Sequence, residues 1–263
     1  MIRLIGKSSR VAKVMLAKKF AHRAELLVLV LASLVPLFML LVWMGIAEEV
    51  SLGGFNAEKF AAYFCLVFLI GEIVSSTATE EVEEDIESGA IASKLLKPFS
   101  ISAQFGLSEL AGAVIRAIPI FMLVIGVFLF TAAGDEVDGK FLTWVPLAVI
   151  LGFMINFLLY YIAGLVAFWS EQASSLDLAL SYLLTLFGGV LAPLTLYPAA
   201  MQSVLEWSPF PYIMYFPIQI IMGDVSTNDI MFGLAFQFAL VAILAVVAKL
   251  VWTLGIKRYG VFG

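Results

Sequence analysis

The stretch LLVLVLASLVPLFMLLVWMGIA, residues 26–47, contains no charge and is bounded by Glu25 and Glu48. A helix needs about 20 largely apolar residues to cross the hydrocarbon core of a bilayer. This stretch therefore predicts a membrane-spanning helix that includes Pro36. It is longer than the apolar core of a cleaved signal peptide, about 7–15 residues, so we expect it to be retained as a first span.

Five more apolar runs of spanning length follow along the chain. They lie between Lys59 and Glu80, Glu109 and Asp135, Lys140 and Glu171, Asp177 and Glu206, and Ile230 and Ile256. Three charges interrupt them, namely Glu72, Arg116 and Lys249. The sequence thus predicts an all-α integral membrane protein with six transmembrane helices. The loops between the runs are too short for a separate soluble domain, so residues 1–263 form one transmembrane domain.

The composition supports this class and excludes others. Of the 263 residues, 62% are hydrophobic and 13% are charged, whereas soluble domains have about 45–50% apolar and 25% charged residues. The formal net charge of −5 offers no basic surface for nucleic acid. Cys65 and His22 are each the only residue of their type, so we expect no intrachain disulfide and no histidine-based metal site.

Lysine and arginine counts orient the chain, because cytoplasmic loops carry an excess of both. Seven precede the first run, two lie between the second and third runs, and two follow the sixth. The opposite side has only Lys59 and Lys140. Both termini are therefore predicted to face the cytoplasm, as an even number of spans requires.

The N-terminal segment, residues 1–24, is predicted to be an amphipathic helix on the cytoplasmic membrane surface. At 100° per residue, Leu4, Val11 and Met15 share one side with other apolar residues. The basic residues on the other side are Arg3, Lys7, Arg10, Lys13 and Lys18. Such a helix binds anionic lipid, so membrane lipid is an expected partner. The alternative is a plain basic anchor before the first span.

Residues 80–104 form a cytoplasmic loop that begins with an acidic run, EEVEEDIESGAIASKLLKPFS at 80–100. Gly89 permits a bend, residues 90–97 have the composition of a short helix, and Pro98 ends it. Ile91 and Leu95 fall on one face of that helix. We expect this apolar face to be displayed to a partner protein. The alternative is a solvated loop that only carries charge.

Residues 193–224, PLTLYPAAMQSVLEWSPFPYIMYFPIQIIMGD, contain five of the nine prolines and six aromatic residues. Repeated proline excludes one continuous helix, and the aromatic content is typical of a membrane interface. A broken, partly re-entrant outer segment between helices five and six meets these constraints, provided that protein neighbours cover its backbone. An aromatic-rich loop on the membrane surface is the alternative.

These features together resemble a type-2 ABC exporter permease, of the ABC-2-like bacterial branch with short loops. The most specific local matches are ESGAIASKLLKP at residues 87–98 and KRYG at residues 257–260. The resemblance covers essentially the whole chain. It implies a multi-pass subunit of the bacterial plasma (inner) membrane that exports an amphipathic or lipid-like substrate.

The resemblance also implies partners and a coupling site. The partners are cytoplasmic ABC ATPase subunits and a second permease chain, identical or homologous. ATP and magnesium would bind to the ATPase, because this chain has no Walker A sequence, no HExxH and no paired catalytic carboxylates. We therefore expect a chain that is not an enzyme and that binds no cofactor. The residues that the resemblance assigns to ATPase coupling are Glu84, Asp85, Glu87, Ser88, Gly89, Ile91, Lys94, Leu95 and Lys97.

Two other function classes remain open from the sequence. An ion- or proton-coupled secondary transporter would use Glu72, Arg116 and Lys249 as pathway charges. A membrane assembly factor would have no transport role. Because unpaired charges are costly within a bilayer, we expect Glu72 and Arg116 to form an ion pair. Counting from Leu107 as the inner end of helix three places Arg116 about 13 Å deep.

Overall fold

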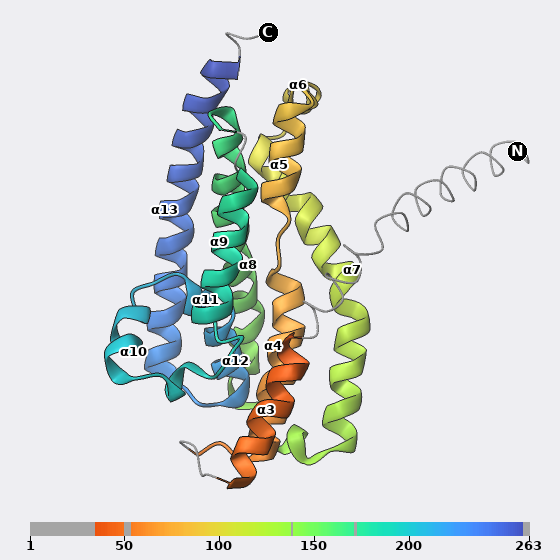
Figure 1. The fold of residues 1–263 in the computed structure, drawn as a ribbon, viewed down its shortest axis with the longest axis vertical. Coiled ribbons are helices and arrows are strands. Elements are labelled where there is room, and N and C mark those ends of the chain that lie inside the picture. Colours follow the sequence, from red (N-terminus) through yellow and green to blue (C-terminus); the bar gives the residue numbers. More distant parts are fainter. Residues whose placement is uncertain (1–34, 50–53, 138, 171–172, 260–263) are drawn as a thin grey trace, which may run out of the picture.

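The computed structural model describes residues 35–49, 54–137, 139–170 and 173–259. The predicted interface helix at residues 1–24 and the first part of the first apolar run lie outside these ranges. The regular elements within them are helices (Figure 1). They are α3 (Val35–Glu49), α4 (Ala57–Val74), α5 (Ala78–Glu87), α6 (Ile91–Leu95), α7 (Ile101–Phe130), α8 (Val145–Leu165), α9 (Ala173–Phe187), α10 (Ala199–Leu205), α11 (Phe210–Ile213), α12 (Tyr215–Met222) and α13 (Thr227–Tyr259), with short 3-10 turns at Ala132–Glu136, Gly139–Trp144, Val166–Phe168 and Leu194–Leu196.

Four described segments are long and apolar enough to cross a membrane, namely Ala57–Glu87, Ile101–Phe130, Phe141–Phe168 and Thr227–Tyr259. They coincide with the second, third, fourth and sixth predicted spans. The fifth apolar run forms α9, which has 15 residues and is shorter than the roughly 20 that a perpendicular span needs. Helix α9 ends before Gly189, whose φ of +92° turns the chain. The count of six spans stays a prediction.

Helix α8 lies at the centre of the helical assembly (Figure 1). Helices α4, α5, α9 and α13 all pack on it, and 72% of its apolar window is buried. Only 11% of the corresponding window of α7 is buried. Helix α7 therefore presents most of its apolar surface outward, where lipid or another protein chain would cover it.

The helices place two functional candidates at opposite ends of the molecule (Figure 1). Helix α6 lies at the end where α13 finishes, and α10 and α12 lie towards the other end. This arrangement is the one required if the loop 80–104 faces the cytoplasm and the segment 193–224 faces outward.

Candidate coupling site and its links to the membrane helices

The acidic run is a helix rather than an irregular loop. In α5, Val82 and Ile86 are buried while Glu84 and Glu87 are exposed, so the helix has one apolar and one acidic face. Its apolar face lies close to α8. A Cβ atom on Gly164 would be 2.8 Å from the Cβ of Val82, closer than real atoms pack. The two helices touch because glycine stands at that position.

Gly89 ends α5 with a φ of +78°, a left-handed conformation that favours glycine. The predicted bend is therefore confirmed. The helix that follows is shorter than residues 90–97, because α6 covers only Ile91–Leu95. We expected Ile91 and Leu95 to share a displayed apolar face. Ile91 is instead fully buried in the core, whereas Leu95 is 46% exposed, so Ile91 anchors the helix.

Helix α6 is fixed to both of its neighbours. The Lys94 ammonium forms an ion pair with Asp85 of α5 and lies 3.7 Å from the centre of the Phe105 ring of α7, a favourable cation–π geometry. The Gln104 side chain donates hydrogen bonds to the carbonyl oxygens of Lys94, at 2.9 Å, and Phe99, at 3.0 Å. Asp85 and Lys94, both predicted coupling residues, therefore hold α6 in place.

An apolar patch lies next to this fixed turn. We define the coupling patch as Leu95, Leu96 and Phe99, whose exposed fractions are 46%, 89% and 64%. The sequence prediction included Leu95 but missed Leu96 and Phe99, although both stand beside charged residues or proline in a loop expected to be aqueous. The other predicted coupling residues that are exposed nearby are Glu84, Glu87, Ser88 and Lys97.

A three-residue break, Ser75–Thr77, separates α4 from α5 (Figure 1). Side chains of other helices satisfy its backbone. Asn156 of α8, which is 1% exposed, donates a 2.7 Å hydrogen bond to the Val74 carbonyl oxygen. A guanidinium nitrogen, Arg116 Nη2 of α7, lies 3.2 Å from the Ser75 carbonyl and 3.0 Å from Ser75 Oγ. The broken backbone is thus hydrogen-bonded within the protein, as backbone polar groups removed from water require.

Glu109 completes this network from α7. Its Oε1 accepts hydrogen bonds from the Thr77 backbone N–H at 2.7 Å and from the Thr77 hydroxyl at 2.9 Å. The side chain is 3% exposed. Thr77 precedes the first turn of α5 and makes no cap with its own side chain. Glu109 therefore provides the acceptor at the start of α5, where unpaired N–H groups favour a negative charge.

The expected ion pair between α4 and α7 is present. Arg116 Nε lies 3.7 Å from Glu72 Oε2, and the two side chains are 36% and 26% exposed. The depth of Arg116 in the bilayer stays a prediction. Helix α7 begins at Ile101 rather than Leu107, so Arg116 lies about 22 Å from the start of the helix. Glu109, treated as a span boundary, is buried inside the same helix.

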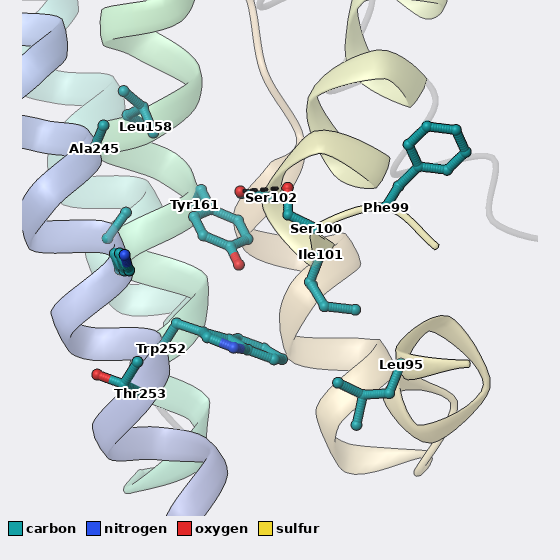
Figure 2. A pocket seen from close by; sticks show the side chains of 12 residues that line it. Leu95, Phe99, Ser100, Ile101, Ser102, Leu158, Tyr161, Ala245, Trp252 and Thr253 are labelled. Carbon is teal, nitrogen blue, oxygen red and sulfur yellow. Dashed lines mark hydrogen bonds between the residues drawn. The ribbon is translucent and has the colours of Figure 1, made fainter. Parts of the chain in front are cut away.

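Lys249 of α13 does not join this pair. Among the described residues it has no hydrogen-bonding or ion-pairing partner, and its side chain is exposed. It lines a cavity of about 490 Å³ between α13, α8 and the junction of α6 with α7. Figure 2 shows Leu95, Phe99 and Ile101 on one side of this cavity and Trp252 and Thr253 on the other.

The segment 193–224 is broken as predicted, into α10, α11 and α12. One backbone carbonyl of this segment, that of Tyr212, accepts a 2.7 Å hydrogen bond from the fully buried Gln237 of α13, whose amide also donates to the Ala148 carbonyl of α8 at 3.0 Å. Just before the segment, the Tyr63 hydroxyl donates to the Gly189 carbonyl at 2.7 Å. The Lys59 ammonium lies 2.8 Å from Asp224, joining α4 to the end of this segment. A re-entrant path through the bilayer stays a prediction.

Sequence reasoning missed three buried polar residues that organise the spans, Glu109, Asn156 and Gln237. For Asn156 and Gln237 the available signal was a polar side chain inside an apolar run, which is costly unless it has a partner, whereas Glu109 stood at the boundary of a run and gave no such signal. Their partners are backbone carbonyls and an N–H group distant in sequence. In the described ranges, no group of three or more His, Cys, Asp or Glu side chains is placed to hold a metal ion.

Comparison with protein families identifies the chain. A family model described as ABC-2 family transporter protein matches residues 29–263. None of the curated proteins and none of the solved structures in the comparison matches. The family match covers the spans, the loop that contains the coupling patch and the broken outer segment. The chain therefore belongs to the ABC-2 family of transporter proteins and is a membrane component of an ABC transporter.

Proposed function

We propose that the chain is the permease subunit of an exporter for an amphipathic or lipid-like substrate, driven by ATP hydrolysis on a separate subunit. It works as a dimer with an identical or homologous permease in the bacterial plasma membrane. Six helices span the membrane, both termini are cytoplasmic, and the segment 193–224 re-enters the outer leaflet. The ABC-2 family itself comprises membrane components that do not hydrolyse ATP and that associate with ABC ATPase subunits.

The coupling patch is the observation that carries this proposal. Leu96 and Phe99 are among the most exposed large apolar side chains of the described chain, and they lie at the end of the molecule predicted to be cytoplasmic. Exposed apolar side chains at an aqueous end are a docking surface for another protein. The acidic face of α5, with Glu84 and Glu87, lies beside the patch and favours a partner with a basic rim.

The contacts below the patch make it suited to transmit force. Lys94 ties α6 to α5 and α7, and Glu109 ties the start of α5 to α7. Movement of an ATPase bound to the patch would thus reach two spans through hydrogen bonds and ion pairs. The outward apolar surface of α7 and the scarcity of polar groups on the spans support an amphipathic cargo.

The test replaces Leu96 with Asp and measures co-purification with a co-expressed candidate ABC ATPase subunit. An unpaired carboxylate at the centre of the docked patch should reduce the binding free energy by about 2 kcal/mol or more, as at an interface hot spot. This corresponds to a loss of about 30-fold in affinity. We expect that loss together with normal membrane insertion. Unchanged ATPase binding and unchanged ATP hydrolysis in proteoliposomes would overturn the coupling role.

A matched control is Val204→Asp in α10, near the other end. Val204 is apolar and 71% exposed, so the substitution adds the same charge at a site far from the patch. It should leave ATPase binding intact. Cargo export is tested separately, with inverted vesicles and fluorescent phospholipid analogues. Transport driven by an ion gradient without ATP would favour the secondary-transporter alternative. The structure gives Arg116 another role, because its guanidinium group is hydrogen-bonded to the α4–α5 break and needs no transported ion there.

A further inference from the structure

Lys249 is a charge that the proposed coupling does not explain. It lies inside the long apolar helix α13, ten residues before its last residue, Tyr259. No described carboxylate pairs with it. A cation at such a position is costly and marks a functional site by default, with a partner still to be found.

The residues that line the cavity beside Lys249 indicate which kind of ligand would bind there. Its walls are largely apolar, with Leu95, Phe99, Leu158 and Trp252 among them. Among the described residues that line it, Lys249 is the one that carries a charge, and the hydroxyl-bearing Ser100 and Ser102 stand at the start of α7. Figure 2 shows the Trp252 ring extending from α13 towards the side of the cavity where Leu95 and Ile101 lie.

We propose that this cavity binds an anionic phospholipid of the inner leaflet. The lipid phosphate pairs with Lys249 and receives hydrogen bonds from hydroxyl groups at the α7 start, while an acyl chain lies against the apolar walls. The positive charge with no neighbouring acid selects an anion. The apolar walls select an amphiphile over a free phosphate ion, and the volume of about 490 Å³ is within the roughly 300–1,000 Å³ of small-molecule sites.

The position of this site gives the lipid a regulatory role. Leu95 and Phe99 belong to the coupling patch and also line the cavity. A bound lipid would bridge α13 to the α6–α7 junction directly beneath the surface proposed for the ATPase. Occupancy would therefore stiffen the connection between that surface and the last span. Lipid binding itself is measured on the purified chain without any ATPase, so it is independent of the proposed export function.

The experiment measures lipid retention by native mass spectrometry of the full-length chain in detergent. The probes are phosphatidylglycerol as the anionic lipid and phosphatidylcholine as the neutral one. We expect preferential retention of phosphatidylglycerol. Lys249→Gln should weaken it about fivefold, the factor typical of one basic residue near anionic lipid, and Lys249→Arg should retain it. Equal binding of both lipids by the wild type would overturn the proposal.

Two further variants separate the cavity from general surface charge. Lys257→Gln removes the same charge two turns further along α13, outside the cavity lining, and should leave retention unchanged. Ala245→Trp fills the cavity while keeping Lys249 and should reduce retention. Equal losses in the Lys257 and Lys249 variants would overturn the site. Displacement of lipid by millimolar inorganic phosphate would assign the site to a soluble anion and also overturn it.

Discussion

Glu109 is the residue whose replacement most directly tests how the α4–α5 break is held. Glu109→Ala removes the acceptor of two hydrogen bonds from Thr77, at 2.7 and 2.9 Å. The Thr77 side chain is exposed, so water replaces the bond to its hydroxyl. The backbone N–H is partly buried and loses its charged acceptor. We therefore expect α5 to lose its fixed start while the spans remain folded.

The size of the effect follows from the N–H bond alone. A hydrogen bond to a charged group contributes about 1.5–3 kcal/mol, so about 2 kcal/mol is expected for Glu109→Ala. In soluble domains of 150–250 residues, 1 kcal/mol shifts the melting temperature by about 2–4 °C. The variant should therefore melt about 4–8 °C lower. Glu109→Gln keeps an acceptor oxygen without the charge, and neutral bonds are about half as strong, so about half of this loss is expected.

The assay is thermal unfolding of the purified chain in one detergent, followed by tryptophan fluorescence. Amide hydrogen exchange of α5 provides a second readout, because exchange should rise there and remain slow in α8. Two results would refute the reasoning. One is a Glu109→Ala melting temperature equal to that of the wild type. The other is a Glu109→Gln variant as unstable as Glu109→Ala, since that would mean that the acceptor oxygen is irrelevant.

Three other predictions concern topology, coupling and the ion pair. Cysteines placed at Ser93 and at Ser226 should react with an impermeant maleimide from the cytoplasmic and outer sides respectively, and labelling from one side alone would contradict the six-span topology. Leu95→Asp should reduce ATPase-coupled transport while membrane insertion is retained, as measured in proteoliposomes; normal coupling would favour a merely solvated loop. The exchanged pair Glu72→Arg with Arg116→Glu should fold but lose the guanidinium bonds to the α4–α5 break, so its melting temperature should fall. Full transport activity in that double variant would limit the pair to a structural role.

The positions of the long helices could be predicted from the uncharged stretches of the sequence. Four predicted spans coincide with long apolar helices, because an uninterrupted run of about 20 apolar residues can be recognised from the local sequence alone. The bend at Gly89 was predictable because a positive φ is a local property of glycine. The breaks in the outer segment were predictable from proline, which lacks an N–H group.

The missed features depend on contacts between distant residues. Ser75–Thr77 contains no proline or glycine, and the break exists because Glu109, Arg116 and Asn156 provide partners from two other helices. Ile91 and Leu95 differ in burial although they are one turn apart, since α6 rests against the core on only one side. Neither outcome can be derived from periodicity alone.

The contact at Gly164 has a mechanical consequence. Helix α5 lies so near α8 there that a single methyl group would not fit, and α4 also packs on α8 on the other side of the break. Helices α4 and α5, on the two sides of the break, are thus both packed on α8. The angle between them is therefore fixed, and the break does not act as a hinge. A load applied at the end that carries α6 would turn this block as one piece, and the hydrogen bonds of Glu109 and Arg116 would carry the movement to α7.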